Sequence, residues 1–212
     1  MIFKLALMPL GGPGEASAGG THEADEPLML RYAAGDIAAF DTLYGRHALG
    51  VWRYVLRGVR DPAVADDLLQ EVWFGVARQA SAYRPTARFK TWLFTMAHNR
   101  MVDHFRTAKN HLSLDGGDAR DEDDGAGDLG DTLAADSGFG PVKRLQSRQQ
   151  AAALITAVEQ LPREQREAFL LQAEGDMSVE EIAAATGASF ETAKSRLRYA
   201  RKALREWLKE FA

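Results

Sequence analysis

Four cationic side chains near the carboxyl end of the chain recur at spacings of three and four residues: Lys194, Arg198, Arg201 and Arg205. On a helix, this spacing places them on one face. Ammonium and guanidinium groups bind phosphate oxygens, and a guanidinium also forms bidentate hydrogen bonds with guanine edges. The favoured chemistry is therefore recognition of a polyanion, with DNA as the first candidate. The alternative is a solvated basic face that binds nothing.

Signals for two short helices surround these cations and would position them. Ser178 and Glu181 have the spacing of a capping box, which predicts the start of a first helix. Gly187 can adopt a left-handed turn, and Ser189 can cap a second, cationic helix. The pattern predicts a helix-turn-helix over residues 177–207, with the second helix suited to a DNA major groove. Its apolar stripe is expected to comprise Phe190, Ala193, Leu197, Ala200, Leu204 and Leu208.

A second cationic segment lies mid-chain and is interleaved with aromatic residues. Residues 84–110 contain six basic side chains and one acidic side chain, Asp103. Cations track a phosphate backbone and aromatic faces accept unstacked bases, so the combination favours single-stranded or melted DNA. Alternatively the aromatics are core, which we expect at least for Phe105 and for one of Phe89 and Trp92. The basic residues are Arg84, Arg88, Lys90, Arg100, Arg106 and Lys109, and the aromatic residues in and beside the segment are Tyr83, Phe89, Trp92, Phe94 and Phe105.

A polar, acidic group precedes this segment in the sequence ADDLLQEVWFGVA. Asp67, Gln70 and Glu71 fall on one face of an otherwise apolar helix, because residues three and four apart are neighbours. This arrangement predicts an acidic docking surface. An ordinary solvated helix face explains the same pattern equally well.

The sequence offers no coherent catalytic group and no cofactor site. His98 and His104 flank Asp103, but positions 98 and 104 lie on different faces of a helix, which argues against a metal site. Residues 121–124 are all acidic, yet the surrounding glycines provide no fixed coordination geometry. With no Gly-rich phosphate loop and no nucleophile paired with a base, we expect no enzyme, no metal and no cofactor.

The elements that must hold these groups are predicted to be helices. Residues 26–109 show helical periodicity, with Asp36 and Asp61 as candidate caps, and His47 on the apolar face is expected to be a core histidine. Residues 142–212 are helical again, and no segment alternates with the period of a strand. The predicted fold class is all-α, with two small domains, the second of four helices.

Composition places a linker between these domains. Residues 113–141 contain nine acidic residues and one basic residue, which more than accounts for the net charge of −4. A segment so acidic and glycine-rich buries too little apolar surface to offset its ordering entropy, so we expect a flexible linker. The chain has no cysteine and no apolar run of membrane-spanning length, which fits the cytoplasm. The first residues faintly mimic a signal peptide, but Pro9 breaks the apolar region and a disordered leader is favoured.

Taken together, these segments resemble the extracytoplasmic-function sigma factors, the smallest type in the bacterial sigma-70 family. The resemblance rests on DDLLQEVWFGVA, RFKTWLFTMAHNRMVDHFR and LPREQREAFLLQAEGDMSVEEIAAATGASFETAKSRLRYARKALRE, in this order across a linker. It implies a disordered leader (1–24), a region 2-like domain (25–110), a flexible acidic linker (111–144) and a region 4-like helix-turn-helix domain (145–212).

The resemblance also implies a function. Such a chain is a specificity subunit of DNA-directed RNA polymerase rather than an enzyme in itself. It binds core RNA polymerase at the β′ clamp helices and the β flap, directs it to promoter DNA, and is regulated by an anti-sigma factor in the cytoplasm, without membrane insertion.

Reading of the −35 promoter element is implied for the second helix of the helix-turn-helix. Arg196 and Arg201 are expected on phosphates and the other positions in the major groove. The implied residues are Thr192, Lys194, Ser195, Arg196, Arg198, Tyr199 and Arg201.

Recognition and melting of the −10 element are implied for the mid-chain segment. Residues 84–91 match the loop that captures a flipped base, and the helix beside it contributes further positions. With the aromatic residues included, the expected set is Arg84, Arg88, Phe89, Lys90, Thr91, Trp92, Asn99, Arg100, Asp103 and Arg106.

Docking on core polymerase is implied for the acidic helix face and its apolar neighbours. The expected residues are Asp67, Leu69, Gln70, Glu71 and Trp73. A two-domain helix-turn-helix repressor or activator is the main alternative, but a sensor domain needs neither this face nor the cationic aromatic segment. A nucleic-acid-processing enzyme is a third possibility and lacks a catalytic group.

Overall fold

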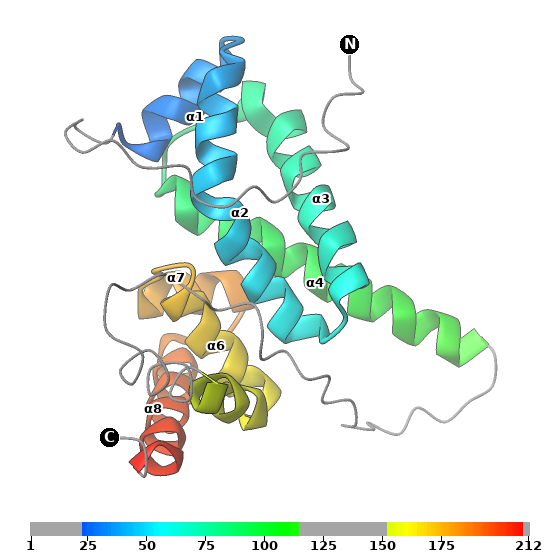
Figure 1. Cartoon of the computed structure of the whole chain (residues 1–212), viewed down its shortest axis with the longest axis vertical. Helices are drawn as coiled ribbons and strands as arrows, with labels where there is room; N and C mark the ends of the chain where they lie inside the picture. The colour runs from blue at the N-terminus through cyan, green and yellow to red at the C-terminus, as the bar shows by residue number, and fades with distance from the viewer. Residues whose placement is uncertain (1–22, 115–151, 210–212) are drawn as a thin grey trace, which may run out of the picture.

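The computed structural model describes residues 23–114 and 152–209, and every regular element within these ranges is helical (Figure 1). The expected all-α fold is therefore confirmed. Most of the predicted leader and most of the predicted linker lie outside the described residues. None of the described helices is both long and apolar enough to cross a membrane.

The first domain is built from four α-helices, and all four contribute buried residues to its core. In Figure 1, helix α4 crosses behind α2. It continues to Leu114, past the domain end predicted at residue 110. A Cβ at Gly75 would lie 2.6 Å from Met96 Sδ, so glycine permits the close approach of α3 to α4. The elements are α1 (Asp25–Ala33), α2 (Ile37–Val59), α3 (Pro62–Gln79), a 3-10 turn η1 (Ala80–Ala82) and α4 (Phe89–Leu114).

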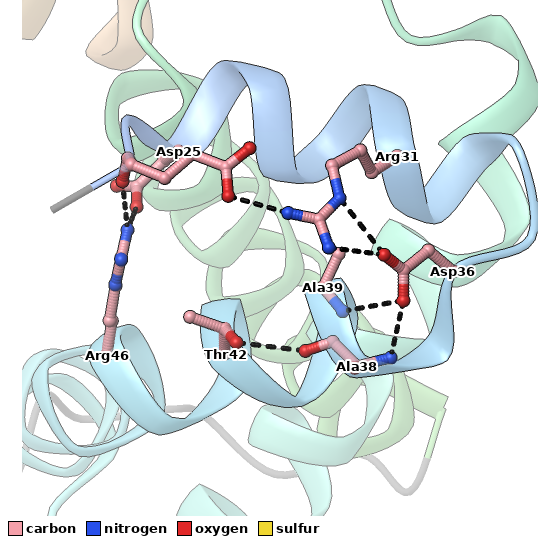
Figure 2. A network of polar contacts seen from close by, with 8 residues as sticks. Asp25, Arg31, Asp36, Ala38, Ala39, Thr42 and Arg46 are labelled. Atoms are coloured by element: carbon pink, nitrogen blue, oxygen red, sulfur yellow. Dashed lines mark hydrogen bonds and ion pairs between the residues drawn. The ribbon is translucent and has the colours of Figure 1, made fainter. Parts of the chain in front are cut away.

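The predicted cap of α2 is confirmed and belongs to a wider polar network (Figure 2). Asp36 accepts hydrogen bonds from the backbone amides of Ala38 and Ala39 at 3.0 and 3.4 Å. Its second carboxylate oxygen accepts from Arg31 at 2.5 Å, which fixes the end of α1 against the start of α2. His47, on α2, lies 2.7 Å from Asp25 on α1, as expected for a core histidine with a polar partner.

The second domain follows the predicted helix-turn-helix closely. Ser178 and Glu181 form both hydrogen bonds of the capping box, at 3.2 and 2.7 Å. Gly187 adopts the left-handed turn with φ of 64°, and Ser189 accepts a hydrogen bond from the Thr192 amide. The helical segments are residues 152–160, α6 (Arg163–Ala173), α7 (Val179–Thr186) and α8 (Phe190–Trp207).

The apolar stripe of α8 differs from the prediction only at its ends. Ala193, Leu197, Ala200 and Leu204 are buried, whereas Phe190 is 42 % exposed. Phe190 opens the helix, so no earlier turn of α8 lies over its ring, and Lys194 lies above that ring at 5.6 Å.

Candidate nucleic-acid interface

The cationic face of α8 is exposed along its full length. Lys194, Arg198, Arg201 and Arg205 all point away from the buried stripe. Three of them have contacts within the chain: Lys194 lies 3.6 Å from Glu191, Arg198 donates to the Tyr199 hydroxyl at 3.2 Å, and Arg201 donates to Gln172 of α6 at 2.5 Å. All three contacts are exposed, so replacing them with phosphate or base contacts costs little free energy.

A groove between α6 and α8 adjoins this face. Thr192, Ser195 and Tyr199 line it from α8, and Arg196 is held beside it by an ion pair to Glu164 at 2.7 Å. The predicted −35 residues therefore divide between the cationic face and the groove. Lys202 is exposed and lies between the two sets, one turn after Arg198, so it completes the same surface. Lys202 is not among the predicted site residues, although its spacing from Arg198 is visible in the sequence.

The loop before α4 presents the other cationic group. Arg84 and Arg88 are exposed, and Lys90 is half-buried at the start of the helix. Further along α4, Asn99 is exposed and Asp103 forms an ion pair with Arg106 at 2.8 Å. Arg100 is half-buried on the same helix. The polar side chains thus form two groups, one in the loop and at the start of α4 and the other at residues 99–106 of that helix.

Two predicted members of this set are buried, and for Phe89 this corrects the assignment. Phe89 has no exposed surface and is enclosed by the rings of Tyr83, Trp92 and His47. It is a core residue and is unable to stack on a base in this arrangement; Trp92 remains half-buried. Thr91 is only 7 % exposed because the second domain covers it.

The acidic face of α3 is exposed as predicted, but the exposed aromatic residue beside it is not the predicted one. Asp67, Gln70 and Glu71 are all exposed, and Leu69 is half-buried. Trp73 is 2 % exposed and packs in the core, so it is unavailable for docking. Phe74, which is not among the predicted docking residues, is 50 % exposed and lies seven residues after Asp67 on the same face.

Within the described ranges, no group of three or more His, Asp or Glu side chains is arranged to hold a metal ion. His98 is instead buried, with Nδ1 at 2.9 Å from Glu167 and 3.3 Å from the Tyr54 hydroxyl. The acidic residues at 121–124 lie outside the described residues.

Two family patterns match the chain at the positions of the two helical domains. Residues 43–111 match Sigma-70 region 2, and residues 151–204 match Sigma-70, region 4. The chain is 33 % identical to the RNA polymerase sigma factor CarQ of Myxococcus xanthus, over 86 % of this chain and 96 % of the relative. It is 31 % identical to the ECF RNA polymerase sigma factor SigL of Mycobacterium tuberculosis, over 84 % of this chain and 93 % of the relative.

The chain belongs to the extracytoplasmic-function group of the sigma-70 family. Two solved structures share its fold. CnrH in complex with the cytosolic domain of CnrY superposes with a TM-score of 0.56 at 23 % identity, covering 90 % of this chain and all of that one. RpoE of Bartonella quintana in complex with the anti-sigma factor NepR superposes with a TM-score of 0.57 at 22 % identity, covering 80 % of this chain and 96 % of that one.

In this sigma factor, region 2 and region 4 pack directly on each other, and Figure 1 shows α6 and α7 beside α2 and α4. Arg53 and Arg57 of α2 both lie 3.3 Å from Glu174, at the end of α6. Burial lowers the pKa of Arg57, although Glu174 opposes that shift. Gly175 follows, and a Cβ there would lie 3.1 Å from the buried ring of Phe94. The contact therefore has an apolar centre with ion pairs around it.

Proposed function

We propose that this chain directs core RNA polymerase to specific promoters. Region 4 reads the −35 element with the exposed face and groove of α8. Region 2 recognises and melts the −10 element with the loop before α4 and the polar residues at positions 99–106 of that helix. The exposed face of α3 docks on the β′ clamp helices, and region 4 contacts the β flap. These events take place in the cytoplasm, where the polymerase works.

The observation that carries the proposal is the separation of two unlike surfaces on one chain. The face of α3 formed by Asp67, Gln70, Glu71 and Phe74 is acidic with an exposed aromatic, which is suited to a protein and unsuited to DNA. The face of α8 is cationic and suits DNA. A repressor needs only the second surface.

Reconstituted transcription tests the proposal. The purified chain is added to core RNA polymerase with a library of promoter fragments, and run-off transcripts are sequenced. We expect transcripts from a subset of fragments sharing −35 and −10 motifs, and none without the chain. Binding of the chain to DNA with no effect on polymerase would instead support a two-domain repressor or activator.

We also infer that an anti-sigma factor holds the chain inactive. Support comes from the two solved relatives, each of which is bound to a second protein: CnrH to the cytosolic domain of CnrY, and RpoE to the anti-sigma factor NepR. A tagged chain expressed in its host and captured with its partners provides the candidates. The inference requires that a purified candidate suppress the reconstituted transcription, and it fails if none does.

A further inference from the structure

Helix α4 begins with a hydrogen bond to a side chain that is distant in the sequence. Arg88 occupies the capping position, and its carbonyl accepts from the Trp92 amide at 3.1 Å. The side chain of an arginine has donors only, so it is unable to accept from the first amides of the helix. The amide of Phe89 instead donates to Glu26 Oε1 at 2.7 Å. Glu26 belongs to α1, 63 positions earlier in the chain.

This hydrogen bond satisfies a group that water does not reach. Phe89 has no exposed surface, and Glu26 is half-buried beside it. A buried backbone amide without a partner costs free energy, so the carboxylate stabilises the first turn of α4. A carboxylate at the amino end of a helix is also favoured by the helix dipole.

The residue before Glu26 fixes this end of α1 on α2. Asp25 Oδ1 accepts from Arg46 at 2.7 Å, and Asp25 Oδ2 lies 2.7 Å from His47 Nε2. Figure 2 shows Asp25 beside Arg46 at the start of α1. All three of these side chains are at most 24 % exposed. Two consecutive acidic residues thus connect α1 to two different helices, Asp25 to α2 and Glu26 to α4.

The loop proposed to contact the −10 element lies between two buried aromatic residues, Tyr83 and Phe89. Residues 84–88 are all exposed, whereas Tyr83 is 5 % exposed and its ring centroid lies 6.3 Å from that of Phe89. Burial raises the pKa of Tyr83 to about 12, and the charges of Glu26 and Asp25 act in the same direction. The Tyr83 hydroxyl has no hydrogen-bond partner among the described residues, so packing holds that end of the loop. A hydrogen bond to α1 holds the other end.

From these contacts we propose that Glu26 is a positioning residue for −10 recognition, because its hydrogen bond to the Phe89 amide holds residues 84–88 in the shape that captures an unstacked base. The inference rests on the proposed function of this loop. It adds a role for α1, which lies outside the residues 43–111 that match Sigma-70 region 2.

A fixed loop favours base capture for a physical reason. A loop that is free to move loses conformational entropy when it binds, and this loss weakens binding and blurs the choice between bases. Without an acceptor at position 26, the first turn of α4 frays and residues 84–88 lose one fixed end. The proposed −35 and docking surfaces lie on α8 and α3, so this change should leave both of them intact.

Three substitutions at position 26 separate the hydrogen bond from the charge. Glu26→Met removes the acceptor oxygens and keeps the length and the helix propensity of the side chain. Glu26→Gln keeps an acceptor oxygen at the same length and removes only the charge. Glu26→Asp keeps the charge and a residue suited to the first turn of a helix, but withdraws the oxygens by one methylene. It should behave as Glu26→Met does, with less effect on folding.

The matched control is Asp61→Ala, which removes the cap of another helix in the same region. The Asp61 side chain accepts from the Ala63 amide at 2.8 Å, at the start of α3. This variant therefore loses a hydrogen bond of the same kind as Glu26→Met. The loop before α4 keeps both of its ends.

The first readout is hydrogen exchange of the Phe89 amide and of residues 84–88 in the free chain, followed by nuclear magnetic resonance. We expect exchange to accelerate on the order of fivefold in Glu26→Met and Glu26→Asp, the effect of losing one capping hydrogen bond. Glu26→Gln and Asp61→Ala should match the wild type at these amides.

The second readout is the affinity of the holoenzyme for premelted promoter fragments, with each base of the −10 element substituted in turn. In Glu26→Met, the preference for the matched base at the captured position should fall about fivefold. The −35 preference and the affinity for core polymerase should not change, which a general folding defect would alter as well. Glu26→Gln and Asp61→Ala should keep the wild-type preference.

Wild-type exchange of the Phe89 amide in Glu26→Met and Glu26→Asp would overturn the proposal. Faster exchange with an unchanged −10 preference would also overturn it, because recognition would then not depend on how the loop is held. So would an equal loss in Glu26→Gln, since the acceptor oxygen would then be irrelevant. Failure of the proposed function gives a different result, namely no promoter-dependent transcription by the wild type, whatever the exchange rates.

Discussion

Trp73 and Phe74 are adjacent on α3 and have opposite environments. The Trp73 ring packs edge-on against Phe40 at 5.5 Å and is 2 % exposed, whereas Phe74 is 50 % exposed beside the acidic residues. A single residue step turns a side chain by about 100° around a helix, so one of two neighbouring aromatics faces the core and the other faces solvent. The exposed ring is the one available to a partner.

Replacement of these two residues should therefore separate docking from folding. We expect Phe74→Ala to weaken binding to core RNA polymerase by about 1–2 kcal/mol with no loss of fold, as for an aromatic anchor. Trp73→Ala should instead destabilise region 2 by about 3–5 kcal/mol, because it leaves a cavity in the core. Polymerase titration by fluorescence anisotropy and thermal unfolding measure the two effects. Equal loss of polymerase binding by two folded variants would contradict this assignment.

The exposed arginine at the middle of α8 provides a second residue-level test. Arg198→Ala should weaken binding to −35 DNA by about 1–3 kcal/mol if the guanidinium reads a base, and should relax the preference at one position. Lys209→Ala removes a cation just beyond the helix and is the control. The measurement is DNA affinity of the holoenzyme on matched and singly substituted promoters. A uniform loss of affinity across all sequences would place Arg198 on phosphate instead.

At the scale of elements, local chemistry defines the turns of the helix-turn-helix. The Ser178–Glu181 capping box, the left-handed Gly187 and the Ser189 cap each involve residues within a few positions of one another. Hydrogen bonds this local depend on neighbouring residue types alone, which is why the sequence was sufficient to predict them. The same holds for Asp36 and Asp61, whose side chains cap α2 and α3.

Gly187 gives a clean test of that local chemistry. Its φ is 64°, and a Cβ would meet no atom within 4 Å, so only backbone conformation opposes a side chain there. We expect Gly187→Ala to destabilise region 4 by about 1 kcal/mol, and Gly187→Asn to cost less because asparagine tolerates this conformation. Denaturant unfolding followed by circular dichroism measures the difference. Equal stability of the alanine variant and the wild type would show that the turn relaxes.

Which side chains face the core depends on residues that are distant in the sequence, and this could not be predicted from local patterns. The periodicity of α3 allowed either Leu69 or Leu68 and either Trp73 or Phe74 to face inward, and packing against Phe40 on α2 decided the second choice. For the same reason, Phe89 was assigned to DNA although its own neighbours enclose it. Long-range packing overrides a pattern that is locally ambiguous.

At the scale of the whole molecule, the contact between region 2 and region 4 joins residues about ninety positions apart, as in Arg88 with Asp176 and Glu181. No periodicity or spacing predicts such a contact. The loop before α4 and the start of α7 looked independent in the sequence, one cationic and the other acidic. Their complementary charge explains why they meet, and it makes the contact between the two regions depend on ionic strength.

Salt should therefore loosen this contact in the wild-type chain. Screening shortens the reach of exposed charges from about 10 Å at 0.1 M to about 3 Å at 1 M, so the ion pairs of Arg88 weaken as sodium chloride is added. We expect spin labels at Gln79→Cys in region 2 and Lys209→Cys in region 4 to give a broader distance distribution as salt is added to the wild type. Salt dependence should be much shallower for the Asp176→Asn, Glu181→Gln variant, which lacks the carboxylates that salt would screen. Equal salt dependence in the two proteins would mean that other charges, such as Glu174 with Arg53 and Arg57, govern the contact.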